Sequence, residues 1–219
     1  MNIGYKALAA LLDYPSAQLQ VNLDDVGAAI NVLGSSASGV APLLAHLRDS
    51  DLLDLQEAYI DTFDRGRRAS LNLFEHVHGD SRDRGQAMVD LLEMYRTAGV
   101  ELDTEQLPDY LPAFLEYLSL LDDSAAREQL ADIAHILQSI HAALARRNSV
   151  YAAVFDVLLE RTGAVESPAT EEEADDTTPE AIDAAWVDAP VNFLDAPAPC
   201  GTSRAQPREQ AIHIHRRAA

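Results

Sequence analysis

The chain has 219 residues and a formal charge of −20 at pH 7, because 36 acidic side chains outnumber 16 basic ones. This balance excludes a nucleic-acid binder that works by bulk charge, since neutralising phosphates requires clustered Lys and Arg side chains. No apolar run reaches the roughly 18 residues that would span a bilayer. The single cysteine, Cys200, can form neither an intramolecular disulfide nor a Cys-based zinc site. We therefore expect a cytoplasmic protein that does not insert into a membrane.

The first 160 residues are typical of helices, because apolar residues recur at spacings of three and four. Alternating strand patterns and Asn-Gly or Asp-Gly hairpin signals do not occur. Gly99 stands where a glycine commonly closes a helix. The pattern therefore predicts an all-α fold with a single helical domain over residues 1–162. The predicted helices are 3–12, 52–63, 84–98, a long one that follows Asp122-Asp123-Ser124 and continues to Leu144, and one from Val150 to Leu159.

The composition changes near residue 162, and the charge changes with it. Residues 161–195 carry one basic and ten acidic side chains (−9), whereas residues 196–219 carry four basic and one acidic (+3). Low hydrophobicity and high charge cannot offset the entropy of ordering a chain. We therefore predict that residues 163–219 form a largely disordered acidic tail. Within it, Thr178-Pro179-Glu180 indicates the start of a short helix at 179–187.

Five of the 16 basic residues lie within twenty positions of this acidic chain. They are Arg65, Arg67, Arg68, Arg82 and Arg84. Because arginine forks bind carboxylates and phosphates through paired hydrogen bonds, the cluster indicates an anion site. The favoured alternative is solvation or pairing with neighbouring carboxylates, the usual role of surface charge. The neighbouring carboxylates are Asp64, Glu75, Asp80 and Asp83.

His76 and His78 lie in the segment Glu75-His76-Val77-His78-Gly79-Asp80, whose residue types bind zinc and iron. Histidines two positions apart point about 200° apart on a helix, whereas helical zinc motifs place them four apart. The spacing disfavours a metal-dependent hydrolase that uses His76, His78 and Asp80, although this alternative stays open. We favour a structural role, with the imidazoles hydrogen-bonded in a buried turn. Nucleophile elbows and phosphate-binding glycine loops do not occur. The residues thus predict neither an enzyme nor a resident metal.

Residues 107–121, LPDYLPAFLEYLSLL, are apolar on nearly every face of a helix that starts between Pro108 and Pro112. Such a helix is either central core or one wall of a groove, and core is the more common outcome. Glu116 is the exception, a carboxylate among apolar neighbours that could meet a cation from a bound partner.

Three stretches carry a resemblance to a known family: LLDYP (11–15), FDRGRRASLNLFEHVHGDSRDRGQAMVDLLEMY (63–95) and LPDYLPAFLEYLSLL (107–121), with a weaker match in DDTTPEAIDAAW (175–186). They resemble the chaperones that assemble the molybdenum cofactor into respiratory nitrate reductase, the nitrate reductase delta subunit family, which is related to the helical maturation chaperones of other redox enzymes. The resemblance implies a helical, non-enzymatic chaperone. It also implies that this chaperone binds the N-terminal segment of the catalytic subunit and holds it for cofactor insertion before membrane docking. A constitutive helical subunit of a complex is the remaining alternative.

We place the client peptide of such a chaperone in an apolar groove, with carboxylates near the peptide's cations. The residues predicted for this groove are Tyr59, Phe63, Phe74, Asp109, Leu111, Phe114, Leu115, Glu116 and Leu118. We expect no permanently bound cofactor. Because molybdopterin is an anionic phosphate ester, we hypothesise a transient contact that senses the molybdenum cofactor. The residues predicted for it are Arg65, Arg67, Arg68, His76, His78, Arg82 and Arg84.

Overall fold

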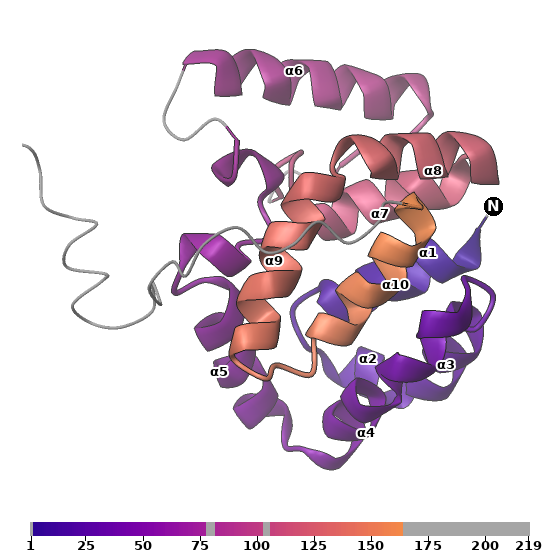
Figure 1. The fold of residues 1–219 in the computed structure, drawn as a ribbon, viewed down its shortest axis with the longest axis vertical. Helices are drawn as coiled ribbons and strands as arrows, with labels where there is room; N and C mark the ends of the chain where they lie inside the picture. Colours follow the sequence, from indigo (N-terminus) through magenta and orange to yellow (C-terminus); the bar gives the residue numbers. More distant parts are fainter. Residues whose placement is uncertain (1, 78–81, 103–105, 164–219) are drawn as a thin grey trace, which may run out of the picture. The chain divides into compact units, whose positions relative to one another are not determined.

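The computed structural model of the chain describes residues 2–77, 82–102 and 106–163, and Figure 1 shows their arrangement. These residues contain ten α-helices, three short 3-10 helices and no strand, so the predicted all-α fold is confirmed. None of the described helices is both long enough and apolar enough to cross a membrane. The structure describes the chain up to residue 163, so the predicted acidic tail from position 164 onward and its predicted helix at 179–187 lie outside the described residues. The helices are α1 (Ile3–Leu12), α2 (Ala17–Val21), α3 (Leu23–Ile30), η1 (Ser35–Val40), α4 (Ala41–Asp49), α5 (Leu52–Phe63), η2 (Arg67–Ala69), η3 (Leu73–Glu75), α6 (Arg82–Thr97), α7 (Leu111–Leu120), α8 (Asp123–Asp132), α9 (Ala134–Arg146) and α10 (Ala152–Thr162).

Most predicted helices agree with the structure. The bounds of α1 and α5 are those predicted, and Gly99 follows α6 with the positive φ of +79° that favours glycine. The long helix predicted after Ser124 is wrong, because the chain leaves helical geometry at Ile133, with φ −101° and ψ 9°, and forms α8 and α9 instead. Apolar residues keep their helical spacing through this break, so spacing alone does not reveal it.

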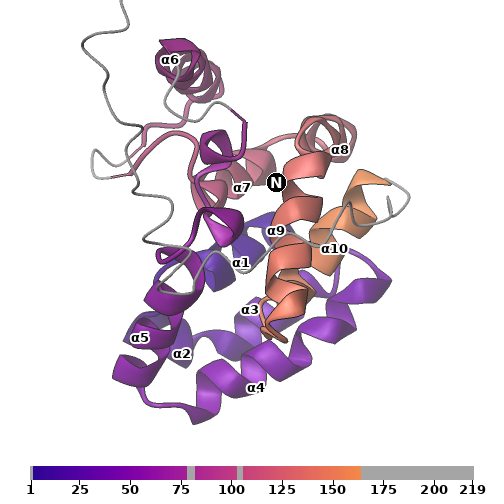
Figure 2. The ribbon, with the colours of Figure 1, turned by 60° about the vertical axis from the view of Figure 1, so that its left-hand side comes forward.

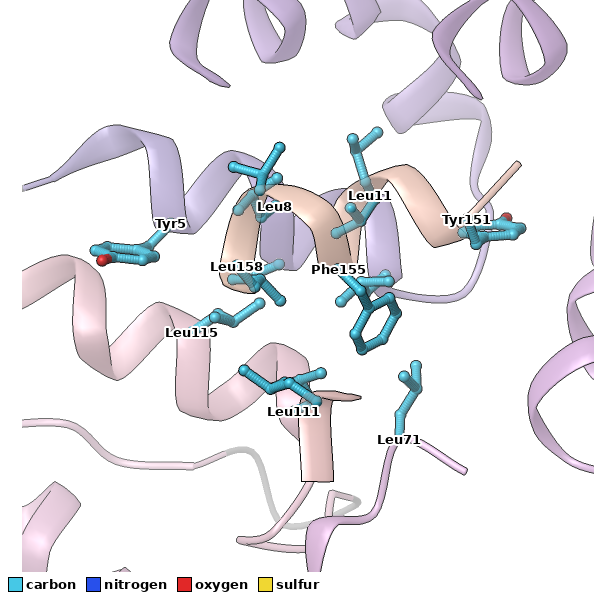
Figure 3. Close-up of a cluster of buried hydrophobic side chains, with 14 of the residues drawn as sticks. Tyr5, Leu8, Leu11, Leu71, Leu111, Leu115, Tyr151, Phe155 and Leu158 are labelled. Carbon is cyan, nitrogen blue, oxygen red and sulfur yellow. The ribbon is translucent and has the colours of Figure 1, made fainter. Parts of the chain in front are cut away.

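The centre of the fold is α1, which packs against α7 and α3, while α10 packs against α9 and η1. The N-cap Asn2 starts α1 by accepting a hydrogen bond from the Gly4 amide at 3.2 Å. Leucine and aromatic side chains of α1, α7 and α10 meet in the interior shown in Figure 3. A Cβ atom on Gly4 would lie 2.4 Å from Leu33 Cγ, so glycine permits the close approach of α1 to the chain at Leu33. The fully buried members of this interior include Tyr5, Leu8, Leu11, Leu111, Leu115, Phe155 and Leu158.

Helix α6 is packed differently. Figures 1 and 2 both show it at one edge of the described chain, away from α1, α9 and α10. Among the α6 side chains that the structure describes, only Tyr95 is buried, while Met88, Leu91 and Met94 are half-buried and Val89 is exposed. The apolar face of α6 is therefore only partly covered.

Candidate functional site

The two segments singled out in the sequence lie side by side. Asn72 and Tyr110 form an isolated antiparallel bridge. On either side of it, the Leu111 amide donates to the Leu71 carbonyl at 2.8 Å, and the Leu73 amide donates to the Asp109 carbonyl at 2.9 Å. The loop that contains η2 and η3 is thereby joined to the start of α7.

Asp109 is the charged group at this junction, and its side chain is fully buried. Its Oδ2 accepts a hydrogen bond from the Phe74 amide at 3.1 Å and lies 3.9 Å from Arg84 Nη2. Its Oδ1 has no hydrogen-bond partner within the described parts of the chain. Burial raises the pKa of the Asp109 carboxyl, and the Phe74 hydrogen bond and the Arg84 charge oppose that rise. The carboxyl therefore connects the η3 loop, α6 and the start of α7.

The segment before α7 holds α6 at two points. Arg84, near the start of α6, faces the Asp109 carboxylate, and the Tyr95 hydroxyl, near its end, donates to the Pro108 carbonyl at 2.9 Å. Burial raises the pKa of Tyr95, so this hydroxyl stays protonated and remains a donor. Both attachments of α6 thus lead to the neighbouring residues 108 and 109.

The structure places most of the residues predicted for the client groove in the interior. Six apolar ones are at most 4% exposed: Tyr59, Phe63, Leu111, Phe114, Leu115 and Leu118. They supply core packing, the more common of the two roles considered for residues 107–121, and offer little surface to a peptide in this conformation. Phe74 is half-buried, Glu116 is exposed and Asp109 is buried. Their role in client binding stays a prediction.

Tyr59 is buried, and its hydroxyl group finds hydrogen-bond partners inside the protein. Its hydroxyl donates to the Leu12 carbonyl at 2.8 Å and lies 2.9 Å from the Tyr110 hydroxyl. Its ring packs against Phe63, with ring centroids 4.8 Å apart. Burial raises the pKa of Tyr59. Tyr59 is thus a satisfied core tyrosine that ties α5 to the end of α1.

The contacts described for three of the arginines are internal and involve groups other than the Asp64 and Glu75 carboxylates, while the side chains of Asp80 and Asp83 lie outside what the structure describes. Arg65 pairs with Asp61, one helical turn earlier, at 3.0 Å. Arg67 donates to the Glu75 carbonyl at 3.3 Å, and Arg84 faces Asp109, far away in the sequence. Arg68 is half-buried, and the Arg82 side chain lies outside what the structure describes.

His76 makes the kind of contact that the structural interpretation predicted. Its half-buried imidazole places Nε2 2.9 Å from the Ser70 carbonyl oxygen. His78 and Asp80 lie outside the described residues. Within the described ranges, no group of three or more His, Cys, Asp or Glu side chains is placed to hold a metal ion. The hydrolase alternative therefore gains no support from the residues that can be placed.

Sequence reasoning missed an open hollow between α6 and the end of α7, with a volume of about 550 Å³. Figure 2 views α6 nearly along its axis, above α7. The available signal in the sequence is the stripe of methionine and leucine on α6, and by itself this stripe indicates only helical periodicity. The hollow is lined by Asp90, Glu93, Met94, Thr97, Ala98, Tyr117 and Leu121.

Comparison with known proteins gives the family. The family model described as "nitrate reductase delta subunit" matches residues 25–156, more than half of the chain. The chain belongs to this family. It is 44% identical over 219 residues to the nitrate reductase molybdenum cofactor assembly chaperone NarJ of Escherichia coli (strain K12), covering 96% of this chain and 89% of NarJ.

Two further relatives extend the comparison. The chain is 41% identical over 196 residues to the probable nitrate reductase molybdenum cofactor assembly chaperone NarW of the same strain, covering 87% of this chain and 83% of NarW. It is 29% identical over 161 residues to the probable chaperone NarJ of Bacillus subtilis (strain 168), covering 72% of this chain and 86% of that relative. The likeness covers 83–89% of the length of each of these relatives.

Proposed function

We propose that this protein is a chaperone for nitrate reductase assembly that assists insertion of the molybdenum cofactor. It acts by binding the N-terminal segment of the catalytic subunit and holding that subunit in the cytoplasm before membrane docking. The observation that carries the proposal is the 44% identity, over 96% of the chain, to a relative named for this assembly role. The relatives are named as assembly chaperones, and accordingly we assign no catalytic residue.

The charge of the chain supports a peptide of this kind as the ligand. With a formal charge of −20, the protein attracts cationic segments and suppresses binding of acidic ones. Helical proteins commonly take an amphipathic helix into an apolar groove, with polar contacts at its rim. An N-terminal segment with cationic and apolar side chains fits such a surface.

Calorimetry of the full chain against the N-terminal peptide of the co-expressed catalytic subunit tests the proposal. We expect saturable binding with one peptide per chaperone, and no binding of a scrambled peptide of equal composition. Deletion of the chaperone gene should leave a catalytic subunit that contains little molybdenum. The absence of peptide binding together with a normally loaded enzyme would overturn the proposal.

The constitutive-subunit alternative predicts a different fate for the chain. A constitutive subunit copurifies with the mature membrane-bound enzyme, whereas a chaperone leaves after maturation. Quantitative mass spectrometry of the purified enzyme separates the two. Stoichiometric metal in the purified chain would instead favour the hydrolase alternative.

Of the residues predicted to touch the client, Glu116 is the exposed carboxylate, and it lies on α7 next to Tyr117. We expect Glu116→Gln to weaken peptide binding while thermal unfolding is unchanged, because an exposed charge contributes little to folding. A variant that binds normally but melts earlier would assign Glu116 to the fold.

The contact with the cofactor is a second part of the proposal. Its basis is the concentration of cations in an acidic chain, and Arg65 and Arg67 are both exposed. Charge reversal at these two positions should leave folding and peptide binding intact while lowering the molybdenum content of the client. An unchanged molybdenum content would remove this role.

A further inference from the structure

We infer that the hollow between α6 and the end of α7 holds the client segment, and that this segment is a short amphipathic peptide with cationic side chains. The inference rests on the proposed function and adds a site that differs from the buried groove residues expected from the sequence. The hollow has a volume of about 550 Å³ and is wide open to solvent, so it can contact one face of a ligand without enclosing it. An open site of this size suits a peptide that buries one face and keeps the other hydrated.

The apolar part of the hollow combines rigid and adaptable side chains. Tyr117 is 6% exposed, and its ring lies 5.2 Å from that of Tyr95 and 6.1 Å from that of Phe114, measured between centroids. It therefore forms a fixed wall. Met94, opposite it on α6, is half-buried, and methionine adapts its shape to different apolar partners. Such a lining accepts an apolar side chain without a single required shape.

The polar part of the hollow is acidic. Asp90 and Glu93 lie on the α6 side, both exposed, and none of the lining residues is basic. Glu93 pairs with Arg96 at 3.0 Å, with both side chains mostly exposed. A solvated pair of this kind contributes little to stability, so a cation from a peptide can replace Arg96 at small cost. Charge complementarity therefore selects a cationic occupant over an acidic one.

Helix α6 can accommodate a longer segment because its inner face is incompletely packed. Met88 and Leu91 continue the apolar stripe of Met94 toward the start of α6, and both are half-buried. Arg84 and Tyr95 attach α6 to residues 108 and 109 through polar contacts, while Leu91 and Met94 pack against the core and remain partly exposed. A peptide laid along this stripe would bury apolar surface that the chain itself leaves partly exposed.

Two pairs of matched variants of the full chain test the site by calorimetry with the N-terminal client peptide. Ala98→Trp fills the hollow from an exposed position, and Ala58→Trp places the same bulk on the exposed side of α5. We expect Ala98→Trp to weaken binding at least about tenfold through steric exclusion, whereas Ala58→Trp changes it less than about twofold. Circular dichroism and thermal unfolding confirm that each variant is folded.

The charge pair provides an independent arm. Asp90→Asn with Glu93→Gln removes two charges at the hollow, and Asp54→Asn with Glu57→Gln removes two exposed charges on α5. We expect the first double variant to weaken binding about fivefold and to reduce its salt dependence, whereas the second changes affinity less than about twofold.

The outcomes separate the site from the function. If the wild-type protein, the Ala98→Trp variant and the Asp90/Glu93 double variant all bind the peptide equally well, the site is wrong and the proposed function is intact. Wild-type protein that does not bind the peptide would overturn both. If the Asp54/Glu57 double variant weakens peptide binding as much as the Asp90/Glu93 double variant, net charge alone attracts the peptide. This result would also overturn the site.

Discussion

The interior around α1 and the helix α6 are built from similar side chains but packed to different extents. Leu8, Leu115 and Phe155 are fully buried between helices, whereas Leu91 and Met94 of α6 are only half-buried. The free energy of local opening ranges from near zero up to the free energy of global unfolding, and it is lower where side chains are less tightly packed. The comparison indicates a rigid centre that defines the fold and a less tightly held helix beside it that is free to adapt.

The largest expected effect comes from replacing a leucine by alanine in the interior, compared with the same replacement on α6. Leu115→Ala should lower the free energy of unfolding by about 2–5 kcal/mol, because it leaves a cavity in the interior. Leu91→Ala on α6 should cost about 1–2 kcal/mol, because its side chain packs against the core but is only partly buried. Urea unfolding with unchanged m-values measures both. Equal losses would place α6 within the rigid centre.

Arg161 gives the next largest effect. Its buried guanidinium donates to the Tyr5 hydroxyl at 3.2 Å and the Leu33 carbonyl at 3.5 Å, and it pairs with Asp123. Arg161→Ala should cost about 2–3 kcal/mol, because several partners lose a charge-assisted donor. Arg127 pairs with the same Asp123 at 2.9 Å but is exposed, so Arg127→Ala should cost less than about 1 kcal/mol. Similar losses from the two variants would contradict the assignment of Arg161 to the rigid centre.

Asp109 tests the attachment of α6. Asp109→Ala should cost about 1–3 kcal/mol, since the Phe74 amide loses its acceptor in a buried place. Asp109→Asn keeps an acceptor oxygen and removes a buried charge, so it should cost less. Hydrogen exchange should show faster opening of α6 in the alanine variant than in the asparagine variant. Equal exchange in the two variants would mean that the junction does not hold α6.

The raised pKa of Asp109 also predicts the direction in which the unfolding free energy changes with pH. Because burial raises the folded-state pKa above the unfolded value, folding favours the protonated carboxyl. The contribution of Asp109 to stability therefore falls as the pH rises from the unfolded pKa to the folded pKa, and it is constant above that. Asp109→Asn should remove this fall from the pH profile of the unfolding free energy.

The smallest effect concerns Glu160, an exposed carboxylate at the end of α10. It accepts hydrogen bonds from the Ser35 amide, the Ser35 hydroxyl and the Ser36 amide, which lower its pKa from 4.5 to about 2. Its contribution to stability is present above pH 4.5 and is lost as the pH falls toward 2. Glu160→Gln should flatten the acid side of the stability profile. An unchanged profile would mean that these contacts do not lower the pKa of Glu160 on folding.

The sequence pattern predicted the helical class and several helices because apolar spacing reports which face of a helix is buried. It could not distinguish core from groove in residues 107–121, since both environments favour the same leucine and aromatic residues. The structure places Leu111 and Leu115 in the core. The break at Ile133 was also invisible, because neither glycine nor proline marks it.

The candidate site was harder to predict because it depends on contacts between distant segments. The bridge between Asn72 and Tyr110, and the pairing of Arg84 with Asp109, have no local sequence signal. Local neighbours of the arginine cluster were therefore expected as partners. A hollow forms where the side chains of two helices do not fill the space between them. The sequence of one helix alone does not show this.

The contact between Arg161 and Tyr5 joins two residues separated by 156 positions in the chain. During translation, the first helix therefore emerges long before the residue that completes its hydrogen bonding. At synthesis rates of about 5–20 residues per second, this delay is about 8–30 seconds. The leucines of α1 stay without α7 and α10 for much of that time. Completion of this fold consequently waits until Arg161 has been synthesised, and a ribosome stalled before this residue would carry a nascent chain whose first helix is still accessible to other chaperones and proteases.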